Sequence, residues 1–353
     1  MANRWVRGMG LVGLGATVIG LAQSGGGGIP PGTTRYNLVV PPGFPKPNIP
    51  PDNQLTNEGV ALGKRLFNEK KLSGNGTQAC SSCHHPADAF SDEGKAVSIG
   101  STGVKGTRNA PALFNLVYER SFFWDGRSPN LRQQALVPIQ NPNEMNQTLP
   151  GAVANLKADA TYVQQFSKAF GSPGINPNRI ALALEQYEMS ILFGNSKYDR
   201  VQQGSATFSN QEQRGLTLFL TPYNPKKGQF GAGCANCHSG PLMSDFCFRN
   251  NGLDSNPADP GREDVTGIGA DYGKFKTPSL RNLTVSGPFM HDGRFATLEQ
   301  VVQHYSTGIE PSATLAPELA KQPGGVQLAK ADQAALVAFL KTLVDPQFVT
   351  SGP

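Results

Sequence analysis

The chain has 353 residues, of which 38% are hydrophobic and 16% are charged, and its formal net charge is +5. This length suits about two domains, and so small a net charge gives no reason to expect a nucleic-acid partner. Beyond the N-terminus, no stretch is apolar for long enough to cross a bilayer as a helix.

Residues 1–22 are typical of an export signal. A short basic region with Arg4 and Arg7 precedes a 15-residue apolar stretch that ends at Ala22 and contains small residues near its end. Because this stretch is short for a membrane helix, an uncleaved anchor is the less favoured alternative. The sequence therefore predicts export to the periplasm. Residues 23–52, rich in Gly and Pro, are expected to form a flexible or extended linker.

Helices are expected in three later segments. Apolar residues recur at helical spacing over 180–191 and 336–343. Residues 297–308 should form a short helix, in which Thr297 and Gln300 form a capping box and Gly308 ends the helix. Many Gly and Pro residues (41 and 28) between such segments predict long irregular loops. The expected fold class is therefore mainly α.

Two Cys-x-x-Cys-His units carry the clearest chemistry. They consist of Cys80, Cys83 and His84, and of Cys234, Cys237 and His238. Two thiols at this spacing can add to the vinyl groups of one haem, and the adjacent imidazole can bind its iron. A zinc ribbon would place its Cys pairs about 15–20 residues apart, whereas 150 residues separate Cys83 from Cys234. The sequence therefore predicts two covalently bound c-type haems and leaves Cys247 without a partner.

The two haem units lie in similar sequence surroundings. The pattern Gly-x-x-Leu-Phe occurs at 63–67 and at 215–219, and a haem unit follows each copy. Such self-similarity argues for two related modules. We expect an N-terminal cytochrome c-like domain over 53–197, a C-terminal one over 198–345 and a tail over 346–353. The two haems should face a shared interface between the domains.

Candidates for a further iron ligand differ between the modules. His85 adjoins His84, and no other His precedes residue 238, so only Met145 and Met189 could cap the first iron. The second module offers Met243, Met290, His291, His304 and Tyr305. This supply favours a first haem with an open face, where a small molecule can bind, over one capped by a Met or from the other domain.

Several ordered motifs resemble the bacterial di-haem cytochrome c peroxidase family, which also contains MauG. Besides the haem units, they are Gly-Thr-Arg-Asn-Ala-Pro-Ala-Leu-Phe-Asn (106–115), Phe-Trp-Asp-Gly-Arg (123–127), Pro-Asn-Glu-Met (142–145), Phe-Lys-Thr-Pro-Ser-Leu-Arg-Asn (275–282) and Phe-Met-His-Asp-Gly-Arg (289–294). The resemblance covers about residues 53–345. It implies that hydrogen peroxide reacts at the first haem and that the second haem relays electrons.

The resemblance also implies roles for single residues. Trp124 would lie between the haems as an electron bridge. Gln134, Pro138 and Glu144 match the family's distal pocket over the first haem. There Glu144 would move a proton while Gln134 holds the peroxide, with Arg127 as the alternative group that polarises the O–O bond.

A calcium ion between the domains is implied in the same way. Asn109 and the carbonyls of Ser286 and Pro288 match the family's calcium ligands, with Ser286 in place of the usual Thr. His291 matches a family His near the second haem. Family members are often dimers, so the resemblance also leaves a homodimer open.

Two departures from the common peroxidase pattern resemble MauG. Ser101 stands where many members carry a His that blocks the first iron, and Tyr305 stands where many carry a Met on the second. A peroxidase that takes electrons from a small cytochrome or cupredoxin is favoured. The alternatives are an oxidase that modifies side chains of a partner protein and a non-catalytic electron carrier. The surface Trp that MauG uses has no counterpart near Ala232, where Tyr223 or Tyr272 could serve instead.

Overall fold

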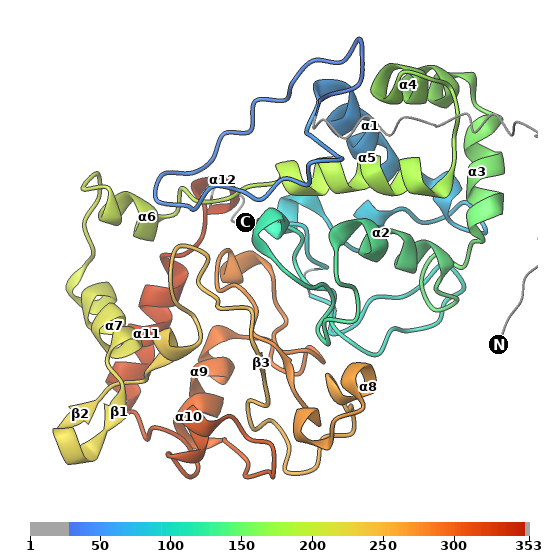
Figure 1. The fold of residues 1–353 in the computed structure, drawn as a ribbon. Coiled ribbons are helices and arrows are strands. Elements are labelled where there is room, and N and C mark those ends of the chain that lie inside the picture. The colour runs from blue at the N-terminus through green and yellow to red at the C-terminus, as the bar shows by residue number, and fades with distance from the viewer. Residues whose placement is uncertain (1–27, 93, 350–353) are drawn as a thin grey trace, which may run out of the picture.

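A computed structural model describes residues 28–92 and 94–349, so the predicted export signal lies outside the described residues. The fold is mainly α (Figure 1). The first half contains α1 (Asn57–Phe67), α2 (Leu131–Gln140), α3 (Leu149–Lys157), α4 (Ala160–Phe170) and α5 (Pro177–Ser190). The second half contains α6 (Lys197–Gln202), α7 (Asn210–Leu220), α8 (Glu263–Thr266), α9 (Leu298–Thr307), α10 (Pro317–Ala320), α11 (Lys330–Lys341) and α12 (Pro346–Val349).

Two small antiparallel sheets accompany the helices. Strand β1 (Tyr223–Asn224) pairs with β2 (Gln229–Phe230), and β3 (Phe248–Arg249) pairs with β4 (Phe275–Lys276). The remaining segments are irregular loops, which agrees with the high Gly and Pro content. Within the described chain, no helix combines the length and the hydrophobicity that crossing a membrane requires.

The buried apolar side chains form two clusters, one in each half. The first is built largely from α1 to α5 and the loops around the first haem unit. The second is built largely from α7, α9 and α11. Figure 1 shows α1 to α5 on one side of the molecule and α7, α9 and α11 on the other.

The repeated Gly-x-x-Leu-Phe pattern sets the closest helix contact in each half. Helix α1 packs on α5, and a β-carbon added at Gly63 would lie 1.9 Å from the Ala183 carbonyl oxygen. Helix α7 packs on α11 in the same way, and a β-carbon at Gly215 would lie 2.0 Å from the Ala335 carbonyl oxygen. Only glycine allows backbones to approach this closely. The sequence repeat therefore reflects the same type of helix packing in both halves, α1 on α5 and α7 on α11.

A second, longer repeat surrounds the site. Residues 108–140 match 275–307 at a constant offset of 167, as Asn115 and Asn282 illustrate. Both of these Asn residues adopt a φ of 57°. At this offset α2 corresponds to α9 in the repeat. Both helices begin after a polar residue whose side chain caps the helix. The two halves therefore present equivalent helices to the space between them.

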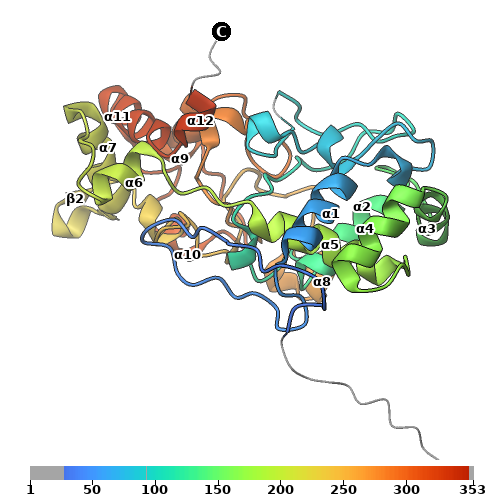
Figure 2. The same ribbon diagram turned by 90° about the horizontal axis from the view of Figure 1, so that it is seen from above.

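The part of the predicted linker that the structure describes, residues 28–52, contains no helix and crosses both halves (Figures 1 and 2). Phe44 lies 5.9 Å from Tyr118 of the first half, between ring centroids, and beneath the Arg281 guanidinium of the second half at 4.7 Å. At the other end of the chain, α12 lies within the predicted tail. Its Phe348 contacts Phe193 of the first cluster, with ring centroids 5.1 Å apart.

Candidate functional site

One cavity of about 840 Å³ lies between the two halves. Both Cys-x-x-Cys-His units line it, and their four Cys residues form no disulfide. The cavity also brings together the predicted site residues Asn109, Trp124, Gln134, Pro138, Glu144, Ser286, Pro288, His291 and Tyr305. Cys247 is exposed and does not belong to this group.

Each unit holds its imidazole ready to bind a metal. Nδ1 of His84 lies 3.0 Å from the Phe90 carbonyl oxygen, and Nδ1 of His238 lies 3.2 Å from the Met243 carbonyl oxygen. Because a carbonyl only accepts, Nδ1 carries the proton in both rings and Nε2 keeps a free electron pair. Burial lowers the pKa of each His to about 4, so both rings are neutral at pH 7. A metal-bound His is usually oriented through its second nitrogen in this way.

The thiols and imidazoles therefore fit two covalently bound haems. Each unit offers two unpaired Cys side chains and one neutral imidazole at the cavity wall. Within the described residues, the buried oxygens Gln134 Oε1 and Glu188 Oε2 at this wall have no hydrogen-bond partner. Buried polar atoms are normally paired, so this lining suits a cavity filled by a polar cofactor and water.

Glu144 lies in the loop that follows α2, with its side chain mostly buried at the cavity wall. Asn141 Nδ2 donates a 2.6 Å hydrogen bond to its Oε1. Burial raises the pKa of Glu144, although the Asn141 hydrogen bond and the Arg127 charge act in the opposite direction. The Glu144 carbonyl accepts a 2.7 Å hydrogen bond from the backbone N–H of Ser101, where many family members have the blocking His. This carboxyl can therefore exchange a proton nearer to neutral pH than an exposed Glu.

The helices α2 and α9 present different residues at matching positions. Gln134 and Pro138 on α2 occupy the places that Val301 and Tyr305 occupy on α9, at the same offset of 167. All four residues line the cavity. Where the second half has a phenol that can bind a metal, the first half has a proline with no donor atom in its side chain.

Tyr305 is half-buried at the cavity wall, and burial raises the pKa of its hydroxyl to about 12. Asn251 Nδ2 lies 3.4 Å from the Tyr305 oxygen and 3.4 Å from Met290 Sδ. His304, the next residue on α9, points elsewhere: its Nε2 lies 3.1 Å from the Asn251 carbonyl oxygen. Asn251 therefore links Tyr305 and Met290, two of the cavity-lining candidates for a ligand in the second half.

The remaining candidate ligands fall into two groups. Met145 and Met290 line the cavity, whereas Met189 and Met243 are buried beside it in the first and second apolar clusters. His291 lines the cavity but is stacked on Phe275, with ring centroids 3.7 Å apart.

Trp124 lies where the two halves meet. Its indole Nε1–H donates a 2.8 Å hydrogen bond to the Asn109 carbonyl, and its own carbonyl accepts a 2.7 Å bond from Lys276 N–H of the second half. Its neighbour Arg127 forms the ion pair with Asp125, at 3.0 Å. The indole is thus held by one backbone carbonyl of the first half, while the Trp124 backbone is bonded to the second half.

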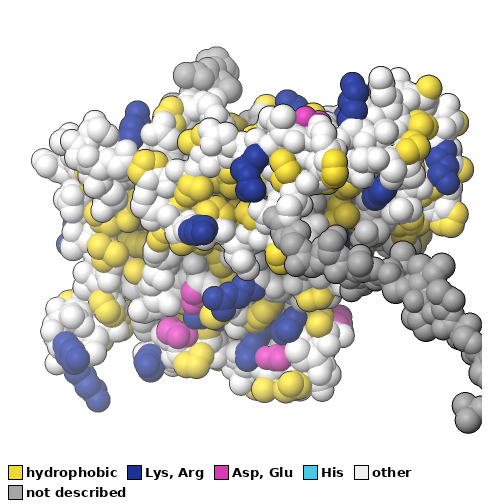
Figure 3. All heavy atoms as spheres, turned by 45° about the horizontal axis from the view of Figure 1, so that its top comes forward, with side chains coloured by type: hydrophobic (Ala, Val, Ile, Leu, Met, Phe, Trp, Pro, Cys, Tyr) yellow, Lys and Arg dark blue, Asp and Glu magenta, His cyan; other side chains and the backbone are white. Residues whose placement is uncertain are grey.

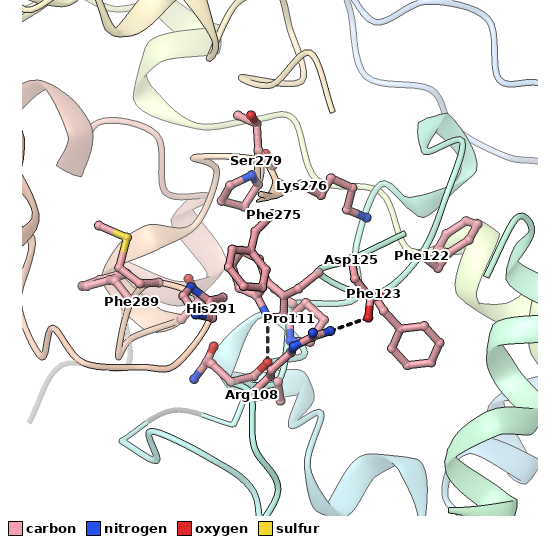
Figure 4. A pocket seen from close by; sticks show the side chains of 18 of the residues that line it. Arg108, Pro111, Phe122, Phe123, Asp125, Phe275, Lys276, Ser279, Phe289 and His291 are labelled. Carbon is pink, nitrogen blue, oxygen red and sulfur yellow. Dashed lines mark hydrogen bonds and ion pairs between the residues drawn. The ribbon is translucent and has the colours of Figure 1, made fainter. Parts of the chain in front are cut away.

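Arg108 ties the halves together and lies near Asp125 and Phe275 (Figure 4). It pairs with Asp125 of the first half and, through Nε at 2.7 Å, with Asp259 of the second half. Its guanidinium also lies 5.5 Å from the centre of the Phe275 ring. The sequence motif at 106–115 contains Arg108, but its spacing did not reveal this role. Sequence reasoning also missed Asn251 and Glu188, which no motif marks.

The predicted calcium ligands also lie at this junction. Asn109 Nδ2 is 3.2 Å from the carbonyl oxygens of both Lys95 and Ala96. Ser286 and Pro288 line the same cavity from the second half. Across the described residues, no group of three or more His, Cys, Asp and Glu side chains is placed to hold a metal ion. The predicted ligands are instead amide and carbonyl oxygens, a donor type that calcium accepts.

Known proteins resemble this chain over most of its length. The family model described as di-haem cytochrome c peroxidase matches residues 57–207. The methylamine utilization protein MauG of Methylorubrum extorquens is 36% identical, over 85% of this chain and 82% of that protein. Cytochrome c551 peroxidase of Nitrosomonas europaea is 36% identical, over 81% of this chain and 80% of that protein. The crystal structure of a MauG-like protein associated with microbial copper homeostasis is 35% identical, with a TM-score of 0.79, over 89% of this chain and 98% of that one.

Proposed function

The chain belongs to the di-haem cytochrome c peroxidase family, and from that premise we propose that it reduces hydrogen peroxide to water at its first haem. The second haem relays electrons that a small donor protein, a cytochrome c or a cupredoxin, supplies. The enzyme works in the periplasm after export by the signal at residues 1–22. The domains that carry the two haems extend over 53–197 and 198–345.

One observation carries this proposal. The two halves use equivalent helices beside their haem units, but Pro138 takes the place of Tyr305. A proline side chain cannot bind iron, so a haem at the first unit would keep a face for peroxide, while Tyr305 would bind the iron of a haem at the second unit. The unpaired Gln134 oxygen and the buried Glu144 carboxyl lie beside the same cavity.

A bound c-type haem supplies an iron that accepts electrons singly and can bind a peroxide oxygen. Overall, one hydrogen peroxide, two electrons and two protons give two water molecules. Glu144 in its ionised form takes a proton from the near peroxide oxygen and returns it to the far oxygen, which leaves as water. The Gln134 amide holds the peroxide in position, and the Pro138 ring keeps other donors away.

Electrons reach the first module through the junction of the halves. Trp124 lies at this junction: its indole N–H bonds to the Asn109 carbonyl of the first half, and its backbone carbonyl accepts a bond from Lys276 N–H of the second half. Tyr305 would favour the ferric and higher states of the second haem, since an anionic oxygen ligand stabilises the oxidised metal. A calcium ion held by Asn109, Ser286 and Pro288 would hold the two halves in a fixed relative position.

The experiment uses the fully ferric, haem-loaded protein without prior reduction. It is mixed with hydrogen peroxide and ferrous cytochrome c, and oxidation of the cytochrome is followed by absorbance. We expect turnover from the first seconds, because Ser101 and Pro138 leave the first haem open. If turnover requires prior reduction of the protein, or if neither haem reacts with peroxide, the proposal is wrong.

A second function is favoured by the likeness to MauG and by Tyr305. In this role the enzyme would withdraw electrons from side chains of a partner protein. Tyr223 lies on β1, in the hairpin that leads to Cys234, and its ring packs 6.3 Å from that of Phe230. The same mixture separates the two roles, because a peroxide-induced change at both haems without oxidation of the cytochrome would favour a protein substrate.

A further inference from the structure

Glu188 is a buried carboxyl that the proposed mechanism does not use. It lies near the end of α5, is 3% exposed and lines the cavity in the first half. Its Oε2 has no hydrogen-bond partner among the described residues. A carboxyl in such a place must either hold a proton or face a charge that the cavity supplies.

Among the residues that the structure describes, no cation is paired with Glu188. The nearest charge on its own helix is Glu185, which is itself bound to Arg132 of α2 at 2.8 Å and to Asn53 at 2.6 Å. On the cavity side, Glu188 acts on the thiol of Cys80 and raises the pKa of that group, which burial raises further. The Cys80 thiol becomes an uncharged thioether once haem is attached, so it cannot balance Glu188 either.

The other elements packed against α5 add no counter-charge. The charged groups of α1 have partners elsewhere: Glu58 accepts a 2.9 Å bond from Thr34 N–H, and Arg65 donates a 2.9 Å bond to Gln165. Lys64 of α1 and Lys157 of α3 are partly or fully exposed. The short helix 116–118 packs on α5 and contributes Tyr118, a neutral phenol whose buried oxygen has no partner in the described chain.

We propose that Glu188 is a redox-linked proton site of the first haem, which binds a proton when that haem gains an electron and releases it when the electron leaves. This rests on the proposed function only in that it requires a haem at the first unit. The electron comes from the donor protein through the second haem and the proton comes from water. On reduction an O–H bond of the Glu188 carboxyl forms as an O–H bond of a solvent hydronium ion breaks, and oxidation reverses both changes.

The physical cause is the low dielectric of the cavity. An added electron makes the potential at a nearby buried carboxylate more negative, and little solvent screens the effect, so the carboxylate binds a proton more tightly. Burial, with the charge of Glu185, raises the pKa of Glu188 to about 8. The group therefore titrates close to neutral pH, where a redox-linked change in protonation can be measured.

The test is a potentiometric titration of the first haem in the holoprotein at several pH values between 6 and 9, without peroxide. In the wild type, the midpoint potential should fall as the pH rises, approaching about 59 mV for each tenfold drop in proton concentration. Glu188→Gln mimics the protonated acid. At every pH, its midpoint potential should therefore stay near the value that the wild type has at low pH. Retention of the full pH dependence in this variant overturns the proposal.

Glu144→Gln is the matched control, because it removes another carboxyl of the first half that lines the same cavity. It should keep most of the pH dependence, since Asn141 and Arg127 already compensate Glu144. If Glu144→Gln abolishes the dependence and Glu188→Gln does not, Glu144 is the linked group and the proposal is wrong.

A second measurement needs no variant and covers the case in which Glu188→Gln fails to fold. The reduced-minus-oxidised infrared difference spectrum of the wild type should show a protonated-carboxyl band that appears on reduction and shifts in D₂O. Absence of such a band overturns the proposal. Neither the redox titration nor the infrared spectrum involves peroxide. A protein that fails to reduce peroxide can therefore still show the proton linkage at Glu188, and the two failures are distinguishable.

Discussion

Replacement of Glu144 by Gln is the sharpest test of the proposed proton transfer. The amide has nearly the same shape, and its oxygen can still accept the hydrogen bond from Asn141, which is 2.6 Å long in the wild type. The change therefore removes the exchangeable proton and leaves the packing intact. Loss of a positioned general acid–base group costs about 10²–10⁴ in rate. That range corresponds to about 3–5 kcal/mol of transition-state stabilisation.

The pH profile gives an independent readout. Burial raises the pKa of Glu144, and the group acts as a base only when it is ionised. In the wild type, kcat/KM should therefore fall as the pH drops through this raised pKa, beginning above the range of an exposed Glu. In Glu144→Gln this acid limb should disappear. Asn141→Ala removes the hydrogen bond that stabilises the carboxylate, so it should move the acid limb to higher pH.

The assay is steady-state oxidation of ferrous cytochrome c by peroxide, with haem content and spectra checked for each variant. Glu310→Gln, which changes an exposed carboxyl, is the control and should behave as the wild type. A loss of less than about tenfold in Glu144→Gln, or an acid limb that persists in it, would refute the assignment of Glu144.

Three further predictions concern stability, coordination and metal binding. Arg281→Met should lower the free energy of unfolding by about 3–5 kcal/mol, because it leaves the buried Asp199 without its cationic partner. Both guanidinium contacts to Asp199 are 2.7 Å, and the Arg281→Met/Asp199→Leu double variant should recover most of the loss in denaturant titrations. Burial alone would raise the pKa of Asp199, but Arg281 holds it below the ordinary 3.8. The stability from this pair should therefore be complete above that pH and be lost as the pH falls through the lowered pKa. Tyr305→Phe should change the absorption spectrum and coordination of the second haem only, and an unchanged spectrum would exclude Tyr305 as its ligand. A calcium chelator should alter haem spectra and activity, and protein that is unaffected would exclude Asn109 as part of a functional calcium site.

The haem units and the helical fold were predictable because their signals are local. The Cys-x-x-Cys-His spacing is a covalent requirement of the cofactor. The predicted box of Thr297 and Gln300 caps α9, and the backbone N–H of Gly308 bonds to the His304 carbonyl. The repeat at Gly63 and Gly215 was visible as well, although only the structure shows that each allows two helices to touch.

The missed residues act through contacts between distant parts of the chain. Arg108 bridges Asp125 and Asp259, which lie 17 and 151 residues away. Glu188 faces the cavity only because α5 packs on α1 and α2. No spacing rule records such contacts, since they depend on how the two halves dock.

Arg127 is a residue for which the sequence suggested a role and the structure shows other contacts. The family resemblance offers Arg127 as an alternative group that polarises the O–O bond, and the structure shows it in an ion pair with Asp125. It also lies 3.5 Å over the Phe123 ring, so its guanidinium is already engaged.

The surface gives less information about the donor protein. On the face in Figure 3, Lys and Arg side chains stand apart among uncharged groups and do not form one basic field.

The spin states of the two irons in the ferric protein, as isolated and never reduced, test the central claim most directly. Low-temperature electron paramagnetic resonance, with the haem content quantified, should show one high-spin ferric haem and one low-spin haem. The high-spin signal should be lost when cyanide binds, because the first haem has an open face. Two low-spin haems that do not respond to cyanide would contradict the account, because a protein group would then cap the first iron despite Pro138.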